Sequence, residues 1–309
     1  MDEILRIVPE TIKKYLNIGT QEDWMWIEEI RLRIGKPVEV VSTKPVSGYN
    51  GPPPVFSEKE SALMMSLLSQ HSLYRLEEEL RRGYITISGG HRVGIAGRVV
   101  VEKGEVKGLR EISSFNIRIA KEKLGVCSPY IQHMYQKGRW MNTLIVGSPK
   151  TGKTTLLRDL ARQISTGMSQ KSIPPKTVAI IDERSEIAGC VRGVPQHHFG
   201  TKVDVLDACP KAEGMMMMIR SMSPEVIIVD EIGREEDVKA VMEAVHAGVT
   251  VISTVHGHSV SDVKRRPAIK TLIEQHAFDS LIELTGIGRK GTIRKLNGER
   301  LSANVVITQ

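Results

Sequence analysis

The sequence predicts a smaller α+β domain over residues 1–135, followed by an α/β domain with a mostly parallel sheet over residues 136–309. Two observations predict this division. After residue 141, apolar runs such as "NTLIVG", "TVAIID" and "EVIIVDE" alternate with helix-forming runs, and the apolar runs lack polar alternation. That pattern is typical of parallel strands covered on both faces. Before residue 120, strand-forming runs follow one another across short glycine turns, which is typical of an antiparallel meander.

The N-terminal elements follow in order. Apolar spacing predicts a helix over residues 4–16, and "WIEEIRLRIGKPVEVV" predicts two strands around a turn at residues 35–37. A proline loop follows at residues 52–54, and helical spacing returns over residues 58–82. The runs "GYITIS", "HRVGIAGRVVV" and "SFNIRIA" predict the meander, and "KEKLGVCSPYIQHMYQKGR" predicts a connecting helix and linker.

The C-terminal elements alternate. Helices are predicted after Gly152, around residues 212–222 and over residues 235–247, with strands between them. Acidic residues at 235–237 suit the positive end of the last of these helices, and Gly248 suits its end. Two basic stretches, at residues 264–267 and 286–295, are expected to form an exposed loop and a hairpin, or to meet a partner or anionic lipid.

Composition indicates the class of protein. The net charge of +7 suits an acidic partner or a solvated basic surface equally. Aromatic residues form only 4% of the chain, which disfavours a nucleic-acid reader built on stacked rings. The three cysteines have neither a metal-binding nor a paired spacing, as in a reduced cytosolic protein. No run approaches the roughly 18 apolar residues of a membrane span, so we expect a soluble cytoplasmic protein that could dock peripherally on a membrane.

A phosphate-binding loop is the strongest motif. "GSPKTGKTT" contains G-x-x-x-x-G-K-[ST] between a predicted strand and a predicted helix, the context that this motif requires. Its backbone N–H groups and the helix N-terminus would face nucleotide phosphates. It predicts a RecA-like P-loop NTPase domain that binds ATP, or less favourably GTP, with Mg²⁺. The nucleotide-binding candidates are Gly147, Ser148, Pro149, Lys150, Thr151, Gly152, Lys153, Thr154 and Thr155.

A buried strand ending in acids completes the expected phosphate site. In "VIIVDEIG", Asp230 is the candidate partner of Thr154 in holding Mg²⁺, and Glu231 is placed to polarise a water molecule. A second acid-tipped run, "IIDERSEI", carries Asp182 and Glu183 and leaves open which acid acts as general base. His256, in "STVHGHS", follows one βα unit later and is a candidate sensor of the γ-phosphate. The carboxyl ends of parallel strands meet at one edge, so these groups are expected to surround one phosphate.

The order of these motifs resembles the secretion-ATPase family, the hexameric motors of type II and type IV secretion and pilus systems. That family has a Walker A loop, an Asp box, a Walker B strand and a His box, matched here by "GSPKTGKTT", "IIDERSEI", "VIIVDEIG" and "GVTVISTVHGHS". The resemblance implies a homohexameric ring. It also implies that arginines reach the phosphates of a neighbouring subunit, for which Arg98, Arg118 and Arg220 are candidates. The family's Asp box usually reads Glu-Asp-Pro, whereas this chain has Asp182, Glu183 and Arg184.

Further stretches extend the resemblance along nearly the whole chain. "EIRLRIGKP", "GGHRVGIAGR", "SFNIRIAKE", "DERSEIAG" and "SMSPEVIIVDEIG" resemble the stage III sporulation AA family, mother-cell ATPases of endospore-forming bacteria. This resemblance implies membrane proteins of the stage III sporulation complex as partners. Two alternatives remain open: a nucleic-acid translocase on the same core, which the basic charge motivates, and a nucleotide-binding scaffold with little turnover.

Overall fold

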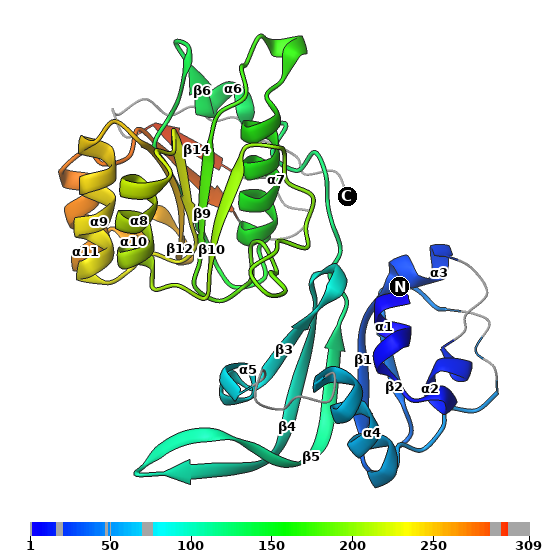
Figure 1. The fold of residues 1–309 in the computed structure, drawn as a ribbon. Helices are drawn as coiled ribbons and strands as arrows, with labels where there is room; N and C mark the ends of the chain where they lie inside the picture. Colours follow the sequence, from blue (N-terminus) through cyan, green and yellow to red (C-terminus); the bar gives the residue numbers. More distant parts are fainter. Residues whose placement is uncertain are drawn as a thin grey trace. The chain divides into compact units, whose positions relative to one another are not determined.

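The computed structural model describes residues 2–16, 21–46, 49, 51–69, 77–284 and 292–295. The chain divides into two compact units, Met1–Lys121 and Glu122–Gln309, which are described separately (Figure 1). Among the helices of these ranges, none combines the length and apolarity that a membrane crossing requires.

The first unit is built on an antiparallel sheet with the strand order β2-β1-β5-β4-β3. Its strands are β1 (Ile27–Arg33), β2 (Glu39–Ser42), β3 (Tyr84–Ile87), β4 (His91–Glu102) and β5 (Glu105–Arg118). Its helices are α1 (Asp2–Ile7), α2 (Glu10–Tyr15), α3 (Gln21–Trp26), α4 (Glu58–Ser69) and α5 (Glu77–Arg82). Side chains alternate between the two faces of a strand. In β1, therefore, Ile30 and Leu32 enter the core while Arg31 and Arg33 lie on the opposite face.

The predicted N-terminal helix is two helices, because Pro9 stands between α1 and α2 and cannot continue the α-helical hydrogen bonding. The predicted helix over residues 58–82 corresponds to α4 and α5, with residues 70–76 outside the described part of the chain. The meander is present, and its turn between β4 and β5 contains Lys103 and Gly104 at positive φ. Such a pair is typical of a tight hairpin turn.

The second unit contains a seven-stranded sheet, within the described residues, in the order β10-β9-β11-β12-β8-β13-β14. Six of these strands are parallel, and β14 runs antiparallel to β13. The strands are β8 (Thr143–Gly147), β9 (Val178–Asp182), β10 (Val203–Asp207), β11 (Val226–Val229), β12 (Thr250–His256), β13 (Ser280–Leu284) and β14 (Thr292–Lys295). The fold class that the sequence predicts is therefore confirmed.

Helices cover both faces of this sheet (Figure 1). The long helix α7 (Lys153–Thr166) packs on one face, and the opposite core contains side chains from the other helices. These are α8 (Lys211–Ser221), α9 (Glu235–His246), α10 (Val260–Val263) and α11 (Pro267–Glu274). The basic stretch at residues 264–267 lies where α10 gives way to α11; of the stretch at 286–295, only β14 is described.

Residues 122–140 form short elements of the second unit: α6 (Ile131–Met134), β6 (Tyr135–Gln136) and β7 (Arg139–Trp140). Cys127, Tyr130 and Ile131 lie in the core that contains α7. The N-terminal domain is predicted from the sequence to extend to residue 135, whereas the buried side chains of residues 122–135 pack in the second unit.

The strand order determines which side chains can meet. Strand β12 lies between β8, which leads into the phosphate-binding loop, and β11, which leads into the acidic pair. His256 at the end of β12 pairs in register with Gly147 at the end of β8. Parallel strands bring their carboxyl ends to one edge, so both motifs and His256 share that edge.

Candidate functional site

The phosphate-binding loop connects β8 to α7 in the conformation that its glycines allow. Gly152 precedes α7 with φ of 90°. A Cβ atom at Gly147 would lie 2.5 Å from the Thr151 hydroxyl oxygen and 3.3 Å from Leu284. Both positions therefore require glycine, one for its backbone angle and one for space. The loop residues 148–150 are partly or fully exposed, and Thr151 is buried with its hydroxyl donating to the Ser148 carbonyl over 2.8 Å.

Lys153 begins α7 with its ammonium folded into the loop. Its Nζ donates to the carbonyl oxygens of Gly147 and Ser148, at 2.8 and 3.0 Å, and contacts Nδ1 of His256 at 3.1 Å. A lysine ammonium has only donors, so His256 accepts this bond at Nδ1 and carries its proton on Nε2. The ammonium therefore occupies the inside of the loop where phosphate oxygens would bind.

The charge environment of Lys153 identifies the acids that face the loop. Burial lowers the pKa of the Lys153 ammonium, and the carboxylates of Asp230, Glu231 and Glu186 oppose that shift. Glu186 also contributes to the raised pKa of Asp230, after burial and Glu231. Glu186 is therefore a third acid near the phosphate-binding motif, in addition to the acids that the sequence predicts there. The sequence feature that could have indicated Glu186 is its position in the same acidic run, four residues after Asp182.

Asp230 accepts hydroxyl hydrogen bonds from two elements. The Thr154 hydroxyl, in the first turn of α7, donates to its Oδ2 atom over 3.2 Å, and the hydroxyl of Thr254 on β12 donates to Oδ1. Burial raises the pKa of Asp230, and the Thr254 bond opposes that rise. Mg²⁺ in nucleotide sites takes one or two protein oxygens and completes its coordination with phosphates and water. The adjacent hydroxyl of Thr154 and carboxylate of Asp230 fit that donor set.

Glu231 follows Asp230 with φ of 52°, in the left-handed region, and its N–H donates to the Thr254 hydroxyl over 2.9 Å. Its carboxylate is bonded on both sides. Oε1 contacts Nε2 of His256, and Oε2 accepts from Nη1 of Arg184 at 2.7 Å. A continuous series of contacts therefore runs from Lys153 through His256 and Glu231 to Arg184.

Asp182 and Glu183 are directed elsewhere in this structure. The Asp182 carboxylate, only 2% exposed, accepts the backbone N–H groups of Glu186, Ile187 and Ala188 at 2.8–2.9 Å. Burial raises the pKa of Asp182 to about 6, although these backbone bonds favour the ionised form. The Glu183 carboxylate pairs with Lys211 at the start of α8. The contacts of Asp182 thus fix the turn after β9, and those of Glu183 join this turn to α8.

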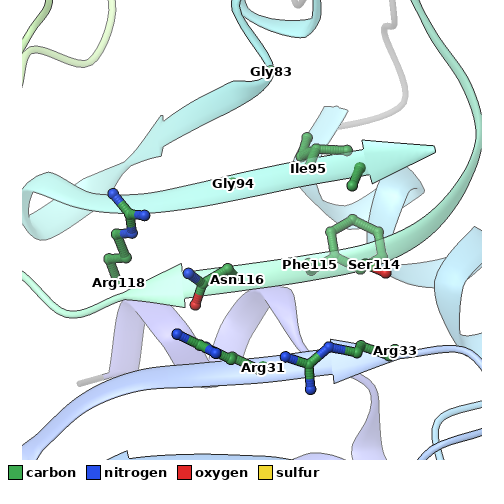
Figure 2. A pocket seen from close by; sticks show the side chains of 10 residues that line it. Arg31, Arg33, Gly83, Gly94, Ile95, Ser114, Phe115, Asn116 and Arg118 are labelled. Atoms are coloured by element: carbon green, nitrogen blue, oxygen red, sulfur yellow. The ribbon is translucent and has the colours of Figure 1, made fainter. Parts of the chain in front are cut away.

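A separate pocket of about 380 Å³ lies on the first unit's sheet (Figure 2). Arg31 and Arg33 of β1 and Arg118 of β5 line it, together with Gly94 of β4 and Asn116 of β5. Arg118 and Arg31 share Glu29 as a partner, at 3.7 and 2.7 Å.

Of the three candidate arginines from the sequence, the structure places Arg118 in this pocket. Arg98 lies outside it, on the part of β4 that pairs only with β5, and contacts Glu111 at 3.5 Å. Arg220 is exposed in the last turn of α8.

Comparison with solved structures supports the fold. The chain superposes on the Legionella pneumophila ATPase DotB with a TM-score of 0.54 and 15% identity, over 83% of this chain and 72% of DotB. It superposes on the pilus retraction motor PilT with bound ADP with a TM-score of 0.54 and 18% identity, over 91% of this chain and 77% of PilT. At these identities the similarity concerns the fold.

Sequence comparison is more specific. The stage III sporulation protein AA of Bacillus subtilis (strain 168) is 55% identical over 298 residues, which cover 96% of this chain and 94% of that protein. The family model described as sporulation stage III, protein AA, matches residues 1–303. The chain therefore belongs to the stage III sporulation protein AA family.

Proposed function

We propose that this protein is a Mg²⁺-dependent ATPase that converts ATP and water into ADP and phosphate. The observation that carries the proposal is that four side chains meet at one edge of the parallel sheet. The Thr154 hydroxyl lies 3.2 Å from the Asp230 carboxylate, and His256 contacts both Lys153 and Glu231. The similar structure of PilT contains ADP, which agrees with a nucleotide site. The sequence contains no evident base-reading motif that favours GTP, so ATP is the nucleotide that we propose.

The loop residues would bind the phosphates. The backbone N–H groups of residues 147–155 other than Pro149 would donate to the phosphates, and Lys153 supplies the positive charge. Thr154 and Asp230 would hold Mg²⁺, which neutralises charge on the phosphate oxygens when it is bound. His256 would then lose Lys153 as its partner, because phosphate oxygens compete for the ammonium. That loss is how His256 would sense the nucleotide.

Glu231 is the proposed general base. The imidazole of His256 contacts both Glu231 and Lys153, and the backbone N–H of Glu231 donates to the Thr254 hydroxyl. Asp182 and Glu183 are the weaker candidates, because their carboxylates bind the turn after β9 and Lys211. Glu186 is an additional candidate, since its charge acts on both Lys153 and Asp230.

The activity is tested by phosphate release from the full chain. Lys153→Ala is expected to abolish turnover, and Glu231→Gln to reduce it at least about 100-fold while ATP still binds. Lys239→Ala, a change at an exposed position of α9, is the control and should behave as wild type. Wild-type turnover no greater than that of Lys153→Ala would contradict the proposal and favour a nucleotide-binding scaffold.

We further propose that the active form is a homohexameric ring in which Arg118 approaches the nucleotide of a neighbouring subunit. The three arginines of the pocket on the first unit's sheet give Arg118 more support than Arg98 or Arg220. Light scattering with and without ATP tests the ring. Arg118→Ala is expected to lower turnover more than Arg98→Ala or Arg220→Ala, and mixing Arg118→Ala with Glu231→Gln subunits should restore part of it.

In the cell, we propose that the ATPase drives or assembles a membrane-associated transport complex during endospore formation. The identity to the stage III sporulation protein AA of Bacillus subtilis supports this role. Its partners would be membrane proteins of the stage III complex, and its place the mother-cell cytoplasm at the membrane. Co-purification of the full chain with those membrane proteins tests the partnership, and loss of spores in a Lys153→Ala strain tests whether ATP hydrolysis is required.

A further inference from the structure

Arg184 lies in the turn after β9, and hydrogen bonds fix the conformation of this turn. Asp182 binds three successive backbone N–H groups of this turn, and the Ser185 hydroxyl donates to the Asp207 carboxylate. Ser185 itself has φ of 52°. These anchors come from the end of β9 and from the adjacent strand β10, so the turn that carries Arg184 is held in place while the Arg184 side chain remains 60% exposed.

The guanidinium of Arg184 is directed at the proposed general base. Nη1 donates to Oε2 of Glu231 over 2.7 Å, which joins the turn after β9 to the end of the neighbouring strand β11. The other carboxylate oxygen, Oε1, contacts His256. A carboxylate with both oxygens engaged is poorly placed to take a proton from water, because one partner must first leave.

The two partners of the Glu231 carboxylate, His256 and Arg184, differ in how easily they can move away from it. His256 belongs to strand β12, and its position pairs with Gly147 of β8, so its backbone is fixed by the sheet. Arg184 is attached to Glu231 by a long and largely exposed side chain. A guanidinium binds phosphate and carboxylate with the same planar geometry. Arg184 also lies close to the proposed phosphate position at the Lys153 ammonium. Only the side chains of Glu231 and His256 stand between them.

We propose that Arg184 is a positioning residue that acts through Glu231. In the chain without nucleotide it holds the carboxylate, and on ATP binding it transfers to the γ-phosphate, which frees Oε2 for the attacking water. This inference rests on the proposed ATPase function. It assigns a role to the position at which the Asp box of this chain has arginine in place of the usual proline.

The test compares ATP with ADP, because only ATP offers a γ-phosphate. Dissociation constants for ATP, at short times or with a non-hydrolysable analogue, and for ADP are measured on the full chain together with kcat. For Arg184→Ala we expect roughly ten-fold weaker ATP binding, ADP binding within about two-fold of wild type, and a kcat at least roughly ten-fold lower. Arg184→Lys keeps the charge without the planar fork and should recover part of the ATP preference.

Arg265→Ala, an exposed arginine of the same unit, is the matched control and should leave all three quantities unchanged. Equal losses of ATP and ADP binding in Arg184→Ala would indicate a merely structural role and overturn the inference. An unchanged preference for ATP would overturn it as well, whatever the kcat. Wild-type protein that binds ATP without hydrolysing it contradicts the proposed function alone, since the ATP-to-ADP ratio still tests Arg184. Wild-type protein that binds neither nucleotide contradicts both.

Discussion

The hydroxyl of Thr154 donates to the carboxylate of Asp230 over 3.2 Å, although 76 positions separate the two residues in the chain. The contact exists because α7 begins at the end of β8, and Asp230 follows the end of β11, with only β12 between these strands. The pairing of these two oxygens therefore follows from the strand order of the sheet.

Asp230→Asn tests this oxygen pair. The amide keeps the shape of the side chain and can still accept a hydroxyl bond, but it removes the negative charge that would attract Mg²⁺ at the proposed site. We expect turnover to fall at least about 100-fold at physiological Mg²⁺ and to recover partly as Mg²⁺ is raised. Phosphate release against Mg²⁺ concentration measures this. Asp204→Asn on the edge strand β10 is the control, and an unchanged Mg²⁺ dependence in Asp230→Asn would show that the metal is held elsewhere.

His256→Ala tests the connection between the phosphate loop and the proposed general base. Without the imidazole, Glu231 loses one partner and Lys153 is no longer coupled to it. We expect kcat to fall by about ten-fold or more, with ADP affinity within about two-fold of wild type, because Lys153 and the loop backbone remain. His246→Gln, at an exposed position of α9, should have no effect. If His256→Ala turns over at the control rate, His256 has no sensing role.

Local motifs and apolar runs predicted much of this molecule. The phosphate loop is contiguous, so its residues and their context can be read directly, and the non-alternating strands β8, β9, β11 and β12 were recognised by their apolar character. Strand β10 was missed because "VDVLD" alternates polar and apolar residues, as suits its place at the sheet edge.

The orientation of the acids could not be predicted. A carboxylate at a strand tip can bind metal, water or backbone, and the sequence is the same in each case. Asp182 binds backbone because the turn after β9 folds back over it, which also brings Glu186 near Lys153. The contact of Arg184 with Glu231 spans 47 positions and depends on β9 and β11 being neighbours. Such contacts follow from the strand order, which the acidic run alone does not specify.

Asp182→Asn tests the structural role of this carboxylate. Asp182 accepts one backbone N–H at Oδ1 and two at Oδ2, whereas an asparagine has a single acceptor oxygen and would turn its NH₂ group towards a donor. A buried donor without a partner costs about 1–3 kcal/mol. We expect the variant to lose stability by about that amount in urea unfolding monitored on the second unit. Stability equal to that of Asp204→Asn would contradict the assigned role.

The raised pKa of Asp182 predicts that the stability of the fold depends on pH. Its folded pKa is raised to about 6, above the unfolded value of about 3.9. Between these values the unfolded chain has released the proton and the folded chain keeps it. The part of the stability that comes from this shifted ionisation is therefore complete below about pH 4, declines as the pH rises, and is lost above about pH 6. Urea unfolding at pH 5 and 7 should show a smaller difference for Asp182→Asn than for wild type. An equal difference would mean that Asp182 is ionised throughout.

Gly147→Ala tests whether the loop conformation itself binds the phosphates. The added Cβ would lie 2.5 Å from the Thr151 hydroxyl and 3.3 Å from Leu284, so the buried threonine must move and the loop with it. We expect the variant to fold, because the change lies at a strand end, and to lose ATP and ADP binding by about ten-fold or more. Titration with a fluorescent nucleotide measures this, and circular dichroism checks the fold. Gly108→Ala on β5 has open space for its Cβ and should bind as wild type does. Normal nucleotide binding by Gly147→Ala would show that the phosphates do not depend on this loop conformation.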